Sequence, residues 1–420
     1  MRWLMGAALA IRIGASLLLA FGPWTDSAEE LAGWDVERFQ QLADFEGQPW
    51  VDEPVQYPPG SVVLIEAVGR SGVVGTHRTL ILTSLVVDIA IAAGLARLGS
   101  TRAATAYLVL GLPLVPMGLL RFDLWSVAIA VGAVWLLVSN RPRWFGLAVM
   151  AAAMVKMWPA LLVAAALAVG RWRAAWWAFC LGAVAGLSWL GWAGATLDPL
   201  QQVISPRGAT GWHLESVPGS VTALAGGGEA ELQLNAYRIG TSSRPLMVAG
   251  QAMAMAVTVA LTTLAWRRRA PIPGSLSNED NDAVSDTNRP NGAERELTMV
   301  AVVMLGATAA LIVSAPLLSP QFLLWLTPWA ALLAVDPGRP DAPILRPLVV
   351  LTGLATLITG VVLGLFGPAG VGTPVPALAL LVRDLVLVLI VGGCLRAVVK
   401  LRPSGTPVEE PLLLPLPNSS

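Results

Sequence analysis

Residues 298–316 read TMVAVVMLGATAALIVSAP, a run that contains no charged side chain. A membrane-spanning α-helix needs about 20 consecutive apolar residues, so this run is long enough to cross a bilayer. Eleven other apolar runs occur along the chain, and several of them are shorter. We therefore predict an all-α polytopic membrane protein with about 12 transmembrane or half-membrane helices. The other runs are residues 3–21, 79–96, 103–120, 122–139, 144–155, 158–169, 174–194, 245–266, 322–335, 347–367 and 376–395.

The composition supports a membrane protein and excludes several classes of function. Only 13% of the residues are charged, 55% are hydrophobic and the mean hydropathy is +0.67, whereas soluble domains carry about 25% charged residues. The 27 basic and 27 acidic side chains balance, which argues against a nucleic-acid partner. Two cysteines and two histidines provide neither a disulfide framework nor a multi-histidine metal site. We expect no cofactor, and a divalent metal ion stays open as an alternative that no spacing of His, Cys or carboxylate residues supports.

The placement of basic residues predicts the orientation. If the N-terminus is cytoplasmic, most Arg and Lys residues between the runs fall on the cytoplasmic side, as the positive-inside rule requires. We therefore expect a multi-pass protein of the cell membrane with both termini in the cytoplasm and an uncleaved first span. These residues are Arg97, Arg102, Arg141, Arg143, Arg171, Arg173, Arg267, Arg268, Arg269, Arg339, Arg346, Arg396, Lys400 and Arg402.

This orientation divides the chain into four parts. Residues 1–266 form an N-terminal membrane region, whose long loops 22–78 and 195–244 are extracytoplasmic. Residues 267–297 are rich in Asn, Asp, Ser and Pro and lack apolar periodicity, which predicts a disordered cytoplasmic linker. A C-terminal membrane region, 298–402, and a disordered tail, 403–420, complete the chain.

The first long loop contains the most informative pattern. Ser27–Glu30 fits a capping box, and apolar residues recur at helical spacing over 31–45, which predicts an amphipathic helix on the outer membrane surface. Asp35 lies at the edge of its apolar stripe. Tyr57-Pro58-Pro59 cannot occupy a helix interior, so we place the short run 60–68 as an interfacial or re-entrant element.

Three blocks of this loop carry a family resemblance: Trp34–Phe39 (WDVERF), Gly47–Trp50 (GQPW) and Pro54–Gly60 (PVQYPPG). In this order after one span, they resemble the polyprenyl-phosphate-mannose-dependent mannosyltransferases, glycosyltransferase family 87 of the C-type membrane glycosyltransferases. One departure is Gln56, where the family often has an acidic residue. Later blocks that are also similar are Arg121–Asp123, Lys156–Pro159, Gly211–Ser216 and Ser319–Trp325.

The resemblance implies a reaction. A sugar, expected to be the hexose mannose with another sugar such as arabinose as the alternative, moves from a polyprenyl-phosphate donor to a hydroxyl group of an extracytoplasmic glycan or glycolipid. It implies Asp35 as the general base, since a positioned carboxylate accelerates such a step by about 10²–10⁴-fold. The other candidates for the base are Asp26, Asp44 and Asp52.

Arg121 and Lys156 are candidates to bind the donor phosphate. Each lies at the outer turn between two apolar runs, where a charge within the membrane is costly and usually paired or functional. The structural alternatives are that Arg121 pairs with Asp123 and that Lys156 extends to the interface. The expected substrate-binding residues are Tyr57, Asp123, Arg207, His213, Glu215 and Gln321, whereas Arg12, Asp88, Arg383 and Asp384 are expected to form intramembrane pairs.

Two other functions fit a polytopic chain with buried charges. A lipid-linked sugar flippase or transporter requires charges along a pathway through the membrane, but here the candidate residues cluster at the outer ends of the spans. No internal repeat is evident, which also weakens the transporter hypothesis. A non-catalytic membrane scaffold is the third possibility, and the presence of Asp35 in the matching block argues against it.

Overall fold

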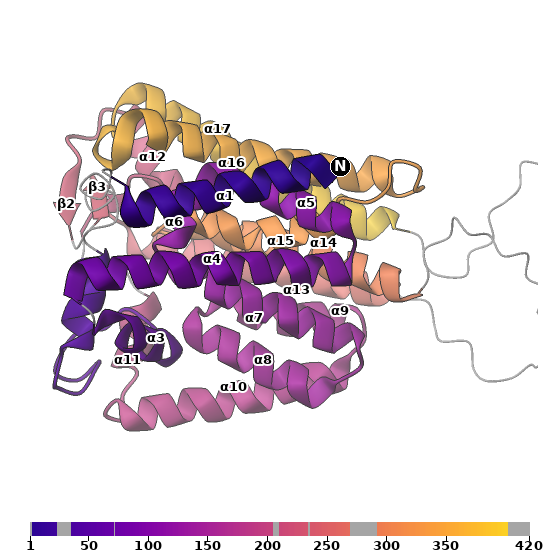
Figure 1. The fold of residues 1–420 in the computed structure, drawn as a ribbon, viewed down its shortest axis with the longest axis horizontal. Helices are drawn as coiled ribbons and strands as arrows, with labels where there is room; N and C mark the ends of the chain where they lie inside the picture. Colours follow the sequence, from indigo (N-terminus) through magenta and orange to yellow (C-terminus); the bar gives the residue numbers. More distant parts are fainter. Residues whose placement is uncertain are drawn as a thin grey trace, which may run out of the picture.

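The computed structural model describes residues 2–22, 35–70, 72–204, 210–233, 236–268 and 292–401. The described chain is mainly helical, and its long helices lie side by side along the long axis of the molecule (Figure 1). Seven of these helices are long and apolar enough to cross a membrane, or eight if one bent pair is counted as a span. The predicted polytopic helical fold is therefore confirmed, but the count of 12 is not.

The seven long helices are α1 (Arg2–Phe21), α4 (Gly72–Leu98), α10 (Trp172–Trp192), α13 (Arg244–Arg268), α14 (Gly292–Ser314), α16 (Ala342–Gly370) and α17 (Pro374–Lys400). The shorter α-helices are α3 (Pro59–Gly69), α5 (Thr101–Leu110), α6 (Val115–Leu119), α7 (Asp123–Val138), α8 (Pro142–Val155), α9 (Leu162–Ala168), α11 (Asp198–Ile204), α12 (Val217–Leu224) and α15 (Thr327–Leu332). Three short 3₁₀ helices are η1 (Leu112–Leu114), η2 (Trp158–Leu161) and η3 (Pro320–Trp325). Residues 35–43 are also helical.

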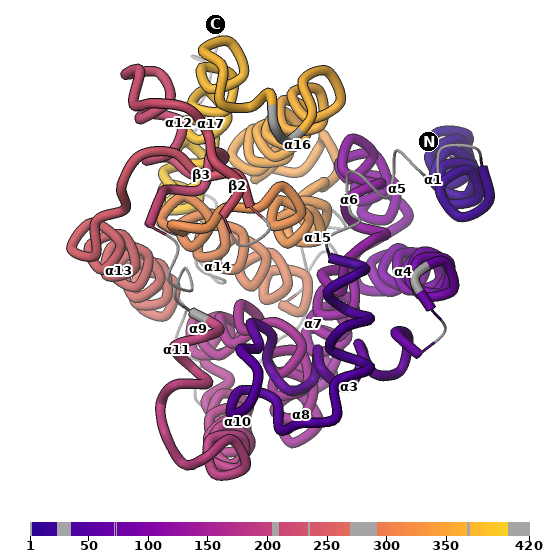
Figure 2. Tube along the Cα trace, turned by 90° about the vertical axis from the view of Figure 1, so that its left-hand side faces the viewer, coloured from indigo at the N-terminus to yellow at the C-terminus, as the bar shows by residue number. Residues whose placement is uncertain are grey.

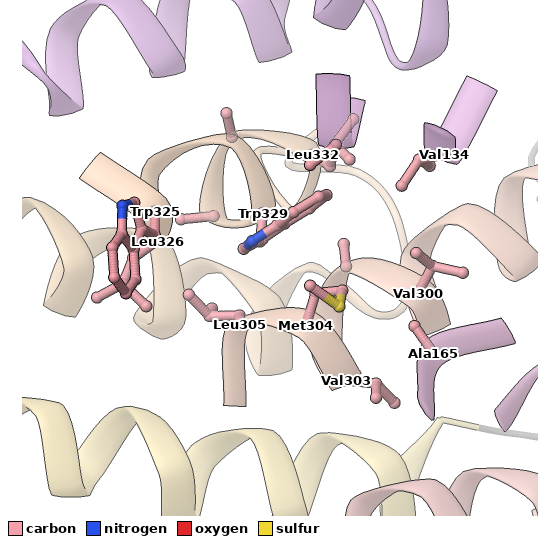
Figure 3. Close-up of a cluster of buried hydrophobic side chains, with 14 of the residues drawn as sticks. Val134, Ala165, Val300, Val303, Met304, Leu305, Trp325, Leu326, Trp329 and Leu332 are labelled. Atoms are coloured by element: carbon pink, nitrogen blue, oxygen red, sulfur yellow. The ribbon is translucent and has the colours of Figure 1, made fainter. Parts of the chain in front are cut away.

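Helix α14 is the central helix of the bundle. In its most apolar window, 78% of the residues are buried inside the protein, against 17–39% for the other long helices. Its run without charges therefore packs against other helices more than against lipid. Figure 3 shows Val300, Met304 and Leu305 of α14 in a buried cluster with Trp329 of α15.

The shorter runs are interrupted, as their lengths predict. Helices α5 and α6 belong to one bent pair with an angle of 45°. Helix α8 ends at Val155, and Lys156 adopts an extended conformation (φ −147°, ψ 136°) before the chain turns into η2 and α9. Runs 144–155 and 158–169 thus reach only part of the way along the bundle, and Lys156 lies at the turn between them.

The second long loop contains a small antiparallel sheet that the all-α prediction missed. Strands β1 (Trp212–His213), β2 (Glu231–Gln233) and β3 (Ala236–Ile239) are arranged in the order β1-β3-β2. Arg238 on the central strand lies opposite His213 on one side and Glu231 on the other. Strands of two to four residues are too short to show an alternating pattern in the sequence.

The two ends of the bundle differ. The sheet, α3 and α12 lie at one end, and the N-terminus of α1 lies at the other (Figure 1). Within the range 267–297 that was predicted as a linker, α13 continues to Arg268 and α14 begins at Gly292. Residues 269–291 and the predicted tail, 403–420, lie outside the described residues.

Two predicted intramembrane pairs are present. Arg12 of α1 forms a buried ion pair with Asp88 of α4, and Tyr107 of α5 donates a hydrogen bond to the same carboxylate. In α17, Arg383 pairs with the adjacent Asp384 at 2.7 Å. Buried charges of this kind are tolerated because each has a partner of opposite sign.

Candidate active site

A cavity of about 650 Å³ lies at the end of the bundle that carries the small sheet. Its walls come from residues 35–58, the turn before α7, the break after α8, the sheet, and residues 311–325. Figure 2 views this end along the helix axes, with the sheet above α14. The cavity thus forms where several helices end or break, which leaves room for polar side chains next to apolar ones.

Tight packing of α3 against α8 fixes one wall. Pro59 is the first residue of α3 and Pro58 is extended, so the predicted exclusion of these prolines from a helix interior is confirmed. A Cβ atom at Gly60 would lie 2.8 Å from the backbone of Met154, so glycine permits this close approach. Ser61 then donates a hydrogen bond of 2.6 Å to the carbonyl of Val155 at the end of α8.

Asp35 and Arg121 meet in this cavity. Asp35 begins the described helix 35–43, and its Oδ2 atom forms an ion pair with Nη2 of Arg121. Both side chains are mostly buried, with 20% and 26% of their surface exposed. Phe39 and Leu42 of the same helix are buried in the protein, so its apolar face covers other protein segments and is not left for a membrane surface. Arg121 therefore pairs with Asp35 and not with Asp123.

Lys156 is held by a second carboxylate. Its Nζ atom lies 3.6 Å from Oδ2 of Asp123, and the other oxygen of Asp123 accepts a hydrogen bond of 2.8 Å from Nε1 of Trp325. Asp123 is completely buried and does not line the cavity. Lys156 also lies 5.7 Å from the ring centroid of Tyr57, at a distance where a cation and an aromatic face attract. Asp123 thus positions Lys156 and Trp325.

Arg38 adds a third cation to the cavity lining. Its Nη2 atom lies 2.7 Å from Oε1 of Glu53 and donates a hydrogen bond of 2.7 Å to the carbonyl of Pro54. Arg38 was not among the predicted site residues, although it lies one helical turn after Asp35, a spacing at which two residues share a helix face.

Two buried ionisable groups come from the loop around β1. Burial raises the pKa of Glu215 to about 8, although the charges of Arg383 and Arg121 oppose this shift. Burial and the nearby charges of Arg238, Arg121 and Arg383 lower the pKa of His213 to about 3. At neutral pH both side chains are therefore uncharged and can act as hydrogen-bonding groups for a ligand.

The structure brings most of the predicted site residues together. Asp35, Tyr57, Arg121, Lys156, His213, Glu215 and Gln321 line the cavity. Gln321 is 2% exposed, and its Oε1 atom has no hydrogen-bond partner among the described residues. Asp44 and Asp52 do not line the cavity, whereas Asp26 and Arg207 lie outside the described residues.

Other lining residues were missed by the sequence analysis. The ionisable ones among them are Arg38, Glu53, Tyr237 and Arg238. The last two belong to β3, which no pattern predicted. Among the described residues, no group of three or more His, Cys, Asp or Glu side chains is placed to hold a metal ion.

Comparison with known proteins adds one finding. A family model described as Glycosyltransferase family 87 matches residues 56–277, which is more than half of the chain. The matched range includes Tyr57, Arg121, Lys156 and the whole sheet, whereas Asp35 and the wall formed by residues 311–325 lie outside it. None of the curated proteins compared with the chain matches it.

Proposed function

Since the chain belongs to glycosyltransferase family 87, we propose that it moves a hexose, mannose, from a polyprenyl-phosphate donor to a hydroxyl group of a glycan or glycolipid acceptor. Family membership implies a glycosyltransferase, and seven or more apolar helices make it a multi-pass membrane protein. The observation that carries the finer proposal is the ion pair of Asp35 and Arg121 inside the cavity. This pair places a base next to a cation.

In this proposal Asp35 acts as the general base. One of its oxygens is held by Arg121, so the carboxylate has a fixed orientation and its other oxygen faces the acceptor. The acceptor oxygen forms a bond to the anomeric carbon of the sugar while the bond from that carbon to the phosphate oxygen breaks. The hydroxyl proton passes to Asp35. Direct attack inverts the configuration at the anomeric carbon, so a β-linked donor gives an α-linked product.

The leaving phosphate requires positive charge. Arg121 and Lys156 line the cavity and stabilise the negative charge that develops on the leaving group, which is often the largest catalytic effect. The lipid chain requires an apolar surface next to these cations. Leu311, Ile312 and Phe322 line the same cavity and provide such a surface.

The basic residues support an extracytoplasmic position for the proposed reaction. The loops that carry the arginine-rich positions lie at the end opposite the sheet and the cavity. Under the positive-inside rule that end faces the cytoplasm, so the proposed reaction takes place on the extracytoplasmic side. A lipid-linked donor suits this location, since nucleotide sugars are cytoplasmic. The packed cluster around Trp329 supports transfer at one surface over movement of a substrate through the bundle.

The direct test measures sugar transfer in purified protein reconstituted in lipid. The donor is radiolabelled polyprenyl-phosphate mannose, and the acceptor is a membrane glycan extract. Asp35→Asn is expected to lower kcat by about 10²–10⁴-fold, while Asp44→Asn, which changes a carboxylate outside the cavity, retains transfer. Equal rates for Asp35→Asn and the wild type would exclude Asp35 as the base.

A second donor tests the identity of the transferred sugar separately from the class of the reaction. If the wild type transfers arabinose but not mannose from the same lipid phosphate, the sugar assignment is wrong and the enzyme class stands. If the wild type transfers neither sugar but moves the labelled lipid across sealed vesicles, the flippase hypothesis replaces transfer.

A further inference from the structure

The charges in the cavity balance except at one residue. Three lining cations each have a carboxylate partner among the described residues, and these pairs are Arg121 with Asp35, Arg38 with Glu53, and Lys156 with Asp123. The fourth lining cation is Arg238 on β3, and no described carboxylate lies in ion-pair contact with it. Glu215 does not offset this charge at neutral pH, because burial raises its pKa to about 8. The described lining therefore carries one unneutralised positive charge.

The surroundings of Arg238 show that this charge is enclosed. Its side chain is only 2% exposed. Nε donates to the carbonyl of Gln233 at 3.4 Å and Nη1 donates to the carbonyl of Gly211 at 3.2 Å. Glu231 lies opposite on β2, but its side chain is exposed and accepts a hydrogen bond from Gln233. Two carbonyl dipoles orient the guanidinium without cancelling its charge, and Nη2 makes no hydrogen bond to any described residue.

His213 stands beside Arg238 on the opposite strand. Directly opposite residues of an antiparallel pair place their side chains on the same face of the sheet, and both residues line the cavity. His213 is 7% exposed, and its Nδ1 atom has no hydrogen-bond partner among the described residues. A neutral imidazole has one N–H donor, so it can contribute a hydrogen bond but no charge.

The turn that follows His213 is held rigidly. The carbonyl of His213 accepts a hydrogen bond of 2.7 Å from Oγ of Ser216. A Cβ atom at Gly219 would lie 2.0 Å from that same carbonyl oxygen, so only glycine fits there. The backbone of His213 is therefore fixed before any ligand binds, which reduces the entropy lost on binding.

We propose that Arg238 and His213 form the binding site for the phosphodiester group of the lipid-linked sugar donor. Arg238 supplies the positive charge and a donor at Nη2, and His213 supplies a neutral donor. A phosphodiester carries a single negative charge, which equals the unneutralised charge of the described lining. Arg121 and Lys156 then have a secondary role in binding the phosphate, since their charges are partly neutralised by Asp35 and Asp123. This inference rests on the proposed function and names the residue that holds its donor.

The assignment has a consequence for the product. Once the sugar leaves, the lipid phosphate becomes a monoester with a more negative charge, close to two units at neutral pH. The same site then holds the product more strongly than the donor. A prenyl monophosphate is therefore a suitable probe of the site, and it requires neither sugar nor acceptor.

The experiment measures binding of farnesyl phosphate to the full-length protein in lipid nanodiscs by calorimetry. Farnesol, which has the same chain and no phosphate, measures the apolar contribution. Arg238→Gln is expected to weaken farnesyl phosphate binding by about 10- to 100-fold, the range for a hydrogen bond to a charged group, and to leave farnesol binding unchanged. Arg238→Lys, which keeps the charge, is expected to retain most of the affinity.

Arg38→Gln is the matched control. It also removes one arginine from the cavity lining, but this arginine is neutralised by Glu53. We expect its effect on farnesyl phosphate binding to be less than about 3-fold, as for a screened pair. Equal losses for Arg38→Gln and Arg238→Gln would overturn the inference, because the cavity would then respond only to total charge. If Arg238→Gln fails to fold, the lysine variant and His213→Gln, which is expected to bind more weakly, provide the test.

Three outcomes separate the inference from the proposed function. If farnesyl phosphate binds wild type and Arg238→Gln equally, the inference is overturned while the donor assignment stands. If wild type binds no farnesyl phosphate, both the inference and the lipid-phosphate donor are overturned. If phosphatidylinositol competes with farnesyl phosphate in wild type, and Arg238→Gln raises the KM of the acceptor but not that of the donor, the site binds an anionic acceptor and the donor assignment is overturned.

Discussion

Replacing Glu215 by Gln gives the sharpest test of the electrostatics of the cavity. Glu215 is 7% exposed, and its Oε2 atom has no hydrogen-bond partner among the described residues. Burial raises its pKa from an ordinary value of 4.5 to about 8. Glutamine has nearly the same shape and never ionises, so Glu215→Gln keeps the volume of the side chain and removes only its titration.

The size of the effect on the free energy of unfolding follows from the pKa shift of Glu215. A rise of about 3.5 units corresponds to about 5 kcal/mol, at about 1.36 kcal/mol per unit. The unfolded chain ionises at the lower pKa, so the folded state binds its proton more tightly between pH 4.5 and 8. Stability therefore falls as the pH rises through this window, and the loss is complete above about pH 8. Glu215→Gln lacks this loss and is expected to be more stable than the wild type at pH 8.

The titration of Glu215 also affects the binding of the ligand. At pH 7 about nine-tenths of Glu215 is protonated, and at pH 9 about nine-tenths is ionised. Ionisation adds a negative charge to a cavity that is proposed to bind an anion. In wild type we therefore expect farnesyl phosphate binding to weaken and the KM of the donor to rise as the pH increases from 7 to 9.

The assay measures farnesyl phosphate binding and the KM of the donor between pH 6 and pH 9.5 for wild type, Glu215→Gln and Glu231→Gln. Glu231 lies on the same sheet but its side chain is exposed, so its variant controls for a change of charge near the cavity. Glu215→Gln is expected to bind equally at pH 7 and pH 9. A decline of the same size in Glu215→Gln and wild type would refute the reasoning, because some other group would then carry the titration.

Two further predictions concern the core and the orientation. Trp325→Phe removes the indole hydrogen bond to the buried Asp123 and should lower the free energy of unfolding by about 1.5–3 kcal/mol more than Trp329→Phe, since Nε1 of Trp329 has no partner among the described residues. Denaturation in detergent measures this, and equal losses would show that the bond to Asp123 adds no stability. In a variant with Cys180 and Cys394 replaced by Ala, a membrane-impermeant maleimide should label Thr196→Cys on intact cells and label Ser139→Cys only after lysis. The opposite pattern would reverse the predicted topology.

The sequence allowed the helical class and many of the lining residues to be predicted, because these depend on local patterns. Runs without charge identify helices whether lipid or protein surrounds them, which is why residues 298–316 correctly predicted a helix but not its central position in α14. The breaks near Lys156 and the start of α3 at Pro59 were also predictable. Proline and run length act over only a few residues, so such features are visible in the sequence.

Pairings between distant residues could not be predicted. The sequence suggested that Arg121 pairs with its neighbour Asp123, but Arg121 contacts Asp35 and Asp123 holds Lys156. Which cation meets which carboxylate depends on how several helix ends converge, and no single segment contains that information. Arg238 was missed for a related reason, because it belongs to a strand too short to show a pattern.

The hydrogen bond between Asp123 and Trp325 also affects the biogenesis of the protein. Its two partners are separated by 202 positions in the chain, and multi-helix proteins are generally synthesised and folded from the N-terminus. While the ribosome is still translating the second half, Asp123 lacks its indole donor and the cavity lacks the wall formed by residues 311–325. A nascent or truncated chain that ends near residue 277 can therefore contain the whole matched family region and still be unable to enclose a substrate. The cavity can therefore close only after residues 311–325, far beyond the matched family region, have been synthesised.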